Sequence, residues 1–199
     1  MSNDSTRLIT GWGRTAPTAA TVVRADPEQV ASVVAAAGPR GLIARGLGRS
    51  YGDPAQNAGG TVLDPLPGAI WVDAERGLAR TSAGTSLHGL ICAAIPQGYF
   101  VPVTPGTRFV TVGGAIAADV HGKNHHHVGS VGSHVVELDL VTADGATRTL
   151  GPNRDPELFW ATVGGMGLTG VITSVLLRLR PWRRGTSPST PSGSPTSTR

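Results

Sequence analysis

Residues Gly46 to Asp53, with the sequence Gly-Leu-Gly-Arg-Ser-Tyr-Gly-Asp, constrain the fold of this chain more than any other stretch. They follow directly on the apolar run Leu42-Ile43-Ala44, which predicts a short buried strand. Closely spaced glycines let several backbone N–H groups point into one small volume, and they remove the Cβ atoms that would block a ligand. Arg45 and Arg49 add charge-assisted donors, and Ser50 adds a hydroxyl. The loop therefore indicates a diphosphate cradle, and the alternative is a sharp glycine-rich surface turn.

A second glycine-rich segment lies later in the chain, where Pro105-Gly106-Thr107 precedes Thr111-Val112-Gly113-Gly114-Ala115-Ile116-Ala117. The apolar and small residues from Val112 to Asp119 predict a short buried helix. Small side chains around a glycine pair form a flat wall against which an aromatic ring system can lie. If both segments hold one ligand, Gly48 and Gly114 must share a cleft, and a fold that separates them would exclude a common site.

His121 and Lys123 follow this wall in the string Asp119-Val120-His121-Gly122-Lys123-Asn124-His125. Both side chains can carry positive charge or move protons, so they are the candidate catalytic residues. The alternative for this segment is a buried turn with a hydrogen-bonded histidine.

The apolar periodicity predicts a mixed α+β chain. Asp26 to Ala37 begins with a helix cap, a proline at the first position and Gln29 as the partner of a capping box. Asp144-Gly145 predicts a hairpin turn. The expected strands are 21–24, 42–44, 61–64, 70–73, 78–81, 135–142, 147–150 and 171–179, and the expected helices are 26–37, 86–95, 112–119 and one that opens at Asp155.

The composition and charge of the chain bear on the kind of partner that it can bind. The chain has 28 glycines, about twice the usual share. Its formal net charge is +4, but Arg183, Arg184 and Arg199 lie after the last acidic residue, Glu157, so the rest is nearly neutral. No stripe of Lys and Arg alternates with aromatic residues, so we expect no nucleic-acid partner.

Cys92 is the single cysteine, which excludes an internal disulfide and predicts a small core residue. Met1 to Thr10 lacks the apolar core of a signal peptide, and no run is apolar enough to predict a transmembrane segment. The compartment stays open between the cytoplasm, the periplasm and a membrane surface.

Two further motifs are better explained as ordinary structure than as a metal site or a dinucleotide-binding site. Adjacent histidines such as His125-His126-His127 cannot all reach one ion, so no metal site is expected and an exposed polar turn is favoured. Gly165 to Gly170 matches the dinucleotide pattern G-x-G-x-x-G, but it follows a predicted helix and opens a strand, the reverse of the required order. Its glycines are expected to pack backbone closely or to touch the edge of a cofactor.

Taken together, these strings resemble the flavoprotein superfamily of vanillyl-alcohol oxidase and para-cresol methylhydroxylase, and within it the decaprenylphosphoryl-β-D-ribose 2-oxidases. The similarity extends from Leu8 to about Arg180 and is carried by these stretches: Thr10 to Thr15, Ala44 to Asp53, Pro105 to Arg108, Thr111 to His125 and Leu158 to Gly165.

The resemblance implies a two-subdomain FAD-binding domain over 17–182, divided near residue 66, after an N-terminal segment 1–16 and without the substrate domain of the family. It implies these cofactor-binding residues: Ala44, Arg45, Gly46, Leu47, Gly48, Arg49, Ser50, Tyr51, Gly52, Asp53, Gly106, Thr111, Val112, Gly113, Gly114, Ala118, Asp119, Val120, His121 and Ile172. Some superfamily members attach FAD through a histidine in the first loop. Arg49 stands in that position here, so the resemblance implies non-covalent FAD.

The implied reaction is oxidation of the ribose 2-hydroxyl of decaprenylphosphoryl-β-D-ribose to a ketone, with hydride passing to the flavin. A partner reductase would complete the epimerisation used for cell-wall arabinan, with His121 and Lys123 near the flavin ring and the substrate phosphate. The tail 183–199 is rich in Arg, Ser, Thr and Pro, which predicts disorder and is consistent with a frame shift. Because the rest of the family's domains is missing from the sequence, weak or absent turnover is one expectation. The alternatives are another sugar or aldonolactone oxidase, or an inactive nucleotide-binding domain.

Overall fold

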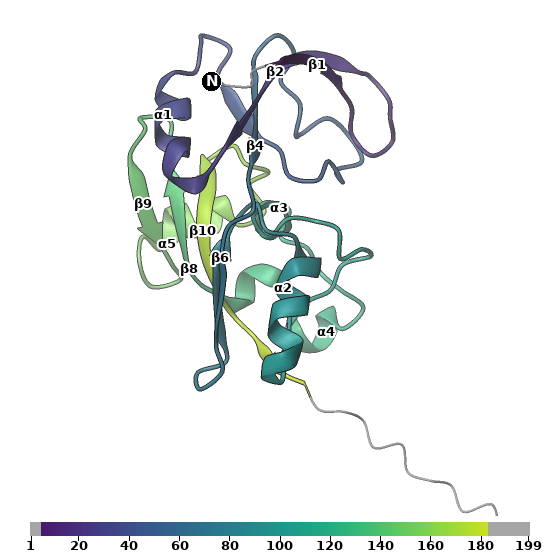
Figure 1. Ribbon diagram of the computed structural model, residues 1–199, viewed down its shortest axis with the longest axis vertical. Coiled ribbons are helices and arrows are strands. Elements are labelled where there is room, and N and C mark those ends of the chain that lie inside the picture. Colours follow the sequence, from purple (N-terminus) through teal and green to yellow (C-terminus); the bar gives the residue numbers. More distant parts are fainter. Residues whose placement is uncertain (1–4, 183–199) are drawn as a thin grey trace, which may run out of the picture.

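The computed structural model describes residues 5–182, which form two β-sheets with short helices, in agreement with the predicted α+β class (Figure 1). The strands are β1 (Ser5–Ile9), β2 (Thr18–Ala25), β3 (Leu42–Ala44), β4 (Thr61–Pro65), β5 (Ile70–Asp73), β6 (Leu78–Ser82), β7 (Tyr99–Phe100), β8 (Val135–Val141), β9 (Thr147–Leu150), β10 (Val171–Arg178) and β11 (Arg180–Pro181). The helices are α1 (Val30–Ala35), α2 (Leu87–Ala94), α3 (Val112–Ala117), α4 (His125–Val128) and α5 (Pro156–Thr162), with 3-10 turns η1 (Pro27–Gln29), η2 (Ile95–Gln97) and η3 (Val131–His134).

The first sheet has the order β1-β2-β4-β3 and lies in the upper part of Figure 1. β2 and β3 both run parallel to β4, and the chain passes from β2 to β3 through α1. The connection begins as its sequence predicts, since the Gln29 side chain accepts a hydrogen bond of 3.0 Å from the Asp26 backbone N–H. This β-α-β unit ends at the carboxyl end of β3, where the glycine-rich loop leaves the sheet.

The second sheet, β5-β6-β10-β8-β9, is antiparallel throughout and lies in the lower part of Figure 1. Its core includes Leu90 of α2, Ile116 of α3 and Phe159 of α5, all fully buried. A separate apolar cluster joins the two sheets, because Leu63 of the first packs with Val141 and Val171 of the second. The two sheets are therefore held together by side-chain packing as well as by the chain.

The structure also corrects and extends the sequence predictions. Both predicted hairpins, β5–β6 and β8–β9, are present. β1 was not predicted, because its residues are mostly exposed and carry no apolar alternation; it pairs antiparallel with β2. Cys92 is not a core residue. It is exposed on α2, with its Sγ 3.7 Å from the Nδ1 of His88, because the buried face of that helix is formed by Leu87, Leu90, Ile91 and Ala94.

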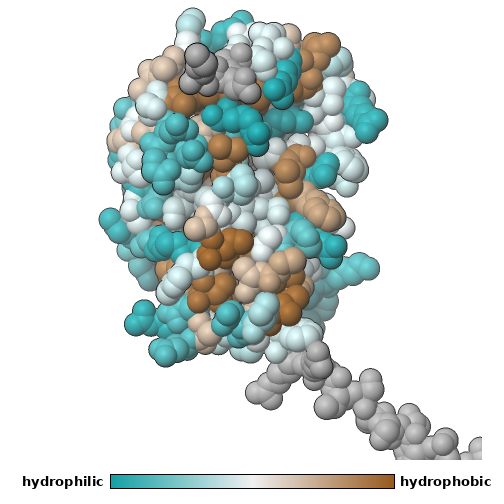
Figure 2. All heavy atoms as spheres, in the orientation of Figure 1, coloured by the Kyte–Doolittle hydropathy of each residue, from teal (hydrophilic) through white to brown (hydrophobic). Residues whose placement is uncertain are grey.

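Figure 2 shows apolar side chains gathered over α2 and the β5–β6 region on this face of the molecule, with polar side chains over most of the rest. Among residues 5–182, no helix has the length and apolarity needed to cross a bilayer. The predicted tail, 183–199, lies outside the described residues.

Candidate functional site: a glycine-lined cavity between the two sheets

The loop after β3 takes a path that only glycine permits at two positions. Gly48 has φ of 64°, in the left-handed region that other residues avoid. Gly46 lies so close to Thr111 that a Cβ atom on Gly46 would collide with the Thr111 side chain. The loop is therefore in direct contact with the start of α3.

Arg45 supports the loop from behind rather than facing the cavity. Its Nη2 donates to the Thr10 carbonyl at 2.6 Å and its Nη1 to the Ala55 carbonyl at 3.1 Å. Burial lowers the pKa of the Arg45 guanidinium below its ordinary value, and the carboxylate of Asp64 opposes that shift. Arg45 thus anchors the segment before β2 to the loop, and this places it outside the group of residues that line the cavity.

The segment around Trp12 packs against the same loop, and Trp12 itself lines the cavity. The Trp12 N–H donates to the Ser50 carbonyl at 2.6 Å. Gly11 lies against the Gly52 carbonyl, where a Cβ atom would collide with it. The loop is consequently fixed on one side by the segment around Trp12 and on the other by Thr111.

α3 forms the opposite wall of the cavity. The Thr111 Oγ1 caps the helix by accepting a hydrogen bond of 3.1 Å from the Gly114 N–H. Val112 is buried in the core of the second sheet. Gly113 lies so close to Ala83 that a Cβ atom added to Gly113 would be 2.7 Å from the Ala83 Cβ. Gly114 and Ala117 line the cavity, so small residues form the wall at α3, as the sequence predicts.

The segment after α3 turns sharply at Asp119, which has φ of 40°. Its Oδ1 accepts a hydrogen bond of 3.0 Å from the Gly132 N–H, and the Val131 N–H donates to the Val120 carbonyl at 2.9 Å. An isolated β-bridge joins His121 to Ser130. These contacts hold the backbone that carries His121.

The two candidate catalytic residues differ in position. His121 is exposed and lines the cavity, whereas Lys123 is exposed and does not line it. The histidines predicted to form a polar turn instead form the single turn of α4, and the His121 and His125 rings meet edge to face with centroids 5.5 Å apart. In the described part of the chain, no cluster of three His, Cys, Asp or Glu side chains is suited to a metal ion.

Both glycine-rich segments line one cavity of about 860 Å³, so the prediction that Gly48 and Gly114 share a cleft is confirmed. Of the predicted cofactor residues, those that line it are Ala44, Gly46, Leu47, Gly48, Arg49, Ser50, Tyr51, Gly52, Gly106, Thr111, Gly113, Gly114, Ala118, Val120, His121 and Ile172. Those that do not line it are Arg45, Asp53, Val112 and Asp119.

The cavity also has lining residues that were not predicted to bind the cofactor. Ala83 lines it after the end of β6 and belongs to no motif, and Thr162 lines it from α5, within the stretch Leu158 to Gly165 that carries the resemblance. Gly167 and Gly170 line it from the connection between α5 and β10. This agrees with the expectation that the misplaced G-x-G-x-x-G pattern approaches a cofactor edge instead of forming a dinucleotide fingerprint.

The lining residues fit FAD. A dinucleotide with a three-ring head needs close backbone approach at its diphosphate and a flat surface at its rings. Gly46, Gly48 and Gly52 bring the backbone of the loop to the cavity on one side, and Gly113 and Gly114 bring the backbone of α3 to it on the other. Arg49, Tyr51 and His121 are the charged or titratable side chains at the cavity wall among the predicted residues.

Comparisons with known proteins agree with this geometry. Residues 18–151 match the FAD binding domain family. The chain is 53% identical over 184 residues to decaprenylphosphoryl-β-D-ribose oxidase of Mycolicibacterium smegmatis, covering 89% of this chain and 40% of that protein. It is 30% identical over 178 residues to alditol oxidase of a Streptomyces species, covering 87% and 42%, and 32% identical over 146 residues to cytokinin dehydrogenase 4 of Arabidopsis thaliana, covering 69% and 28%. The chain spans less than half the length of each of these relatives.

Proposed function

Because this chain belongs to the FAD-binding domain family, we propose that it is the FAD-holding part of an oxidoreductase that acts on CH–OH groups. The observation that carries the proposal is the single cavity shared by Gly48 and Gly114. Glycines from two segments far apart in the sequence line this one cavity, so backbone can approach a long ligand closely from both.

The division of the chain follows the two sheets. We assign residues 17–66 to one subdomain and 67–182 to the other, with 1–16 as a preceding segment. β1 lies in that segment but pairs with β2 of the first sheet, so the segment is a structural part of the first subdomain. The cofactor would lie between the two, as in para-cresol methylhydroxylase-type domains.

Each wall has a separate role. The loop from Ala44 to Asp53 would hold the diphosphate through backbone N–H groups and Arg49, while Gly106, Thr111 to Gly114 and Ile172 would surround the rings. When bound, FAD supplies the acceptor for the hydride of the substrate carbon. His121 lines the cavity and is suited to take or return the hydroxyl proton there. Lys123 is exposed nearby on the chain and is suited to bind a substrate phosphate.

We propose decaprenylphosphoryl-β-D-ribose as the substrate, with its 2-hydroxyl oxidised to a ketone. The support is 53% identity over 89% of this chain to an oxidase named for that compound. A reductase that consumes the ketone would then be its partner. The similarity to alditol oxidase also extends over most of this chain, so a free alditol or aldonolactone is the second candidate substrate.

Purification of the chain with added FAD tests the proposal. We expect flavin absorbance that persists through gel filtration. Gly114→Leu should reduce flavin retention about tenfold, because a Cβ at Gly114 would lie 2.8 Å from the Thr111 Oγ1 and would disturb the cavity wall that both residues line. Gly38→Leu is the matched control, since a Cβ at Gly38 meets nothing within 4 Å and Gly38 does not line the cavity. A colourless wild-type protein would refute FAD binding, and flavin reduction by an alditol but not by the ribose lipid would favour the second substrate.

A further inference from the structure

Arg49 contacts a neighbour on each side of the cofactor loop. Its guanidinium carbon lies 4.6 Å from the centroid of the Trp12 ring, and its Nε donates to the Phe109 carbonyl at 3.1 Å. Trp12 lies between β1 and β2 of the first sheet, and Phe109 lies in the segment that leads to α3. All three residues line the cavity, so this chain of contacts joins its two walls.

Both partners of Arg49 are themselves held in place. The Trp12 N–H is hydrogen-bonded to the Ser50 carbonyl at 2.6 Å. The Phe109 N–H donates to the Thr107 Oγ1 at 3.1 Å, and the Phe109 ring packs against His88 with centroids 5.3 Å apart. Arg49 therefore connects two segments that are fixed independently, rather than two free loops.

The partners of Arg49 are an aromatic face and a carbonyl oxygen, neither of which carries a formal charge. Both still attract a cation, because a ring face and a carbonyl oxygen are electron-rich. A guanidinium is suited to this geometry, since its planar group can stack on a ring while one N–H is directed elsewhere.

We propose that Arg49 is a positioning residue that latches the cavity: it ties the Trp12 segment to the Phe109 segment and thereby slows departure of the cofactor. The latch rests on the proposed function in one respect, namely that FAD is the occupant. It differs from a role in which Arg49 acts only as a charge beside the diphosphate, because a charge role does not require Trp12.

The test is a double-mutant cycle of Trp12→Leu and Arg49→Met in the full chain. FAD dissociation is followed by flavin fluorescence after dilution. Each single variant should release FAD about fivefold faster than wild type, the size expected for loss of one cation–π contact, and the double variant should be no faster than the single variants. Trp71→Leu and Arg178→Met are matched controls, because both residues are exposed and lie outside the cavity.

Hydrogen exchange of the FAD-free chain gives a readout that needs no cofactor. Arg49→Met should raise exchange of the amides in 10–14 and 107–111 about fivefold, and Arg178→Met should not. Faster release in Arg49→Met with an unchanged rate in Trp12→Leu would overturn the latch in favour of a charge role, and additive effects would overturn it as well. If wild type binds no FAD, the proposed function fails, and the exchange experiment alone then upholds or refutes the Arg49 contact.

Discussion

The backbone of Gly46 lies directly against the side chain of Thr111, so the two walls of the cavity, the loop after β3 and α3, are in direct contact there. Thr111 is at the same time the cap of α3, through its hydrogen bond from the Gly114 N–H. Any atom added at Gly46 therefore displaces a side chain that holds the opposite wall of the cavity.

Gly46→Ala should lower the free energy of unfolding by about 1–3 kcal/mol, the usual cost of overpacking, and should weaken FAD binding as well. Denaturant unfolding and flavin titration measure the two effects. Gly38→Ala is the control outside the cavity, because a Cβ there meets nothing within 4 Å. Wild-type stability and affinity in Gly46→Ala would show that Thr111 can move without consequence.

Asp119→Ala should be destabilised by about 1–3 kcal/mol, because it loses the acceptor for the Gly132 N–H and places alanine at a φ of 40°. Asp119→Asn should stay close to wild type, since asparagine tolerates the left-handed region and its amide oxygen accepts the same bond. Thermal unfolding compares the two variants. Equal losses in both would mean that the carboxylate charge, rather than geometry, determines the role of Asp119.

FAD should be held without a covalent bond, because Arg49 occupies the position of the attaching histidine and cannot form that bond. Acid precipitation of the flavin-loaded chain should leave the yellow colour in the supernatant. A yellow pellet after washing, with a mass increase equal to FAD, would contradict this prediction.

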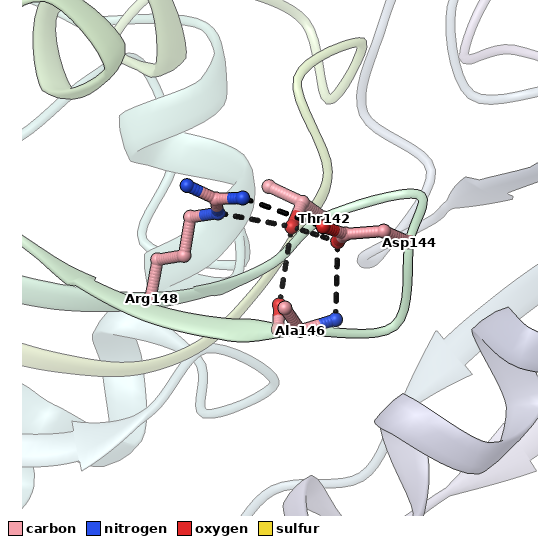
Figure 3. Close-up of polar contacts among 4 residues, drawn as sticks. All are labelled: Thr142, Asp144, Ala146 and Arg148. Atoms are coloured by element: carbon pink, nitrogen blue, oxygen red, sulfur yellow. Dashed lines mark hydrogen bonds and ion pairs between the residues drawn. The ribbon is translucent and has the colours of Figure 1, made fainter.

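The turn between β8 and β9 supplies a pH-dependent test of stability (Figure 3). Hydrogen bonds to Asp144 from the Thr142 hydroxyl at 2.5 Å and the Ala146 N–H at 3.1 Å lower the pKa of its carboxyl, with a further contribution from Arg148 at 3.3 Å. A carboxyl whose pKa is lowered by folding stabilises the folded state above its unfolded pKa of about 3.9 and loses that contribution as the pH falls through the folded value.

Asp144→Asn should therefore lower the unfolding temperature at neutral pH, and the difference from wild type should disappear in acid. The effect should be small and should shrink with added salt, since the side chains of Asp144 and Arg148 are exposed. Thermal unfolding across pH measures it, with Asp53→Asn as an exposed control. A difference that grows as the pH falls would contradict the sign of this argument.

Those elements of the fold whose cause is local could be predicted from the amino-acid sequence. Three features depend on backbone preferences and on hydrogen bonds within a few residues: the capped start at Asp26, the Asp144-Gly145 hairpin and the glycine loop after Ala44. Such features can be predicted from the order of the residues alone. The two candidate walls around Gly48 and Gly114 were also identified in this way, because a loss of Cβ atoms is visible as glycine.

The residues that those walls face, and those that support them, depend on how the two sheets pack. Ala83 and Thr162 reach the cavity because separate strands and helices pack together, and no spacing in the sequence encodes that approach. Arg45 and Arg49 are both arginines of one loop, yet one supports the loop from behind and the other bridges the cavity walls. The direction of a side chain depends on the backbone path through a glycine at positive φ and on partners distant in the chain, so it becomes fixed only when the two sheets pack.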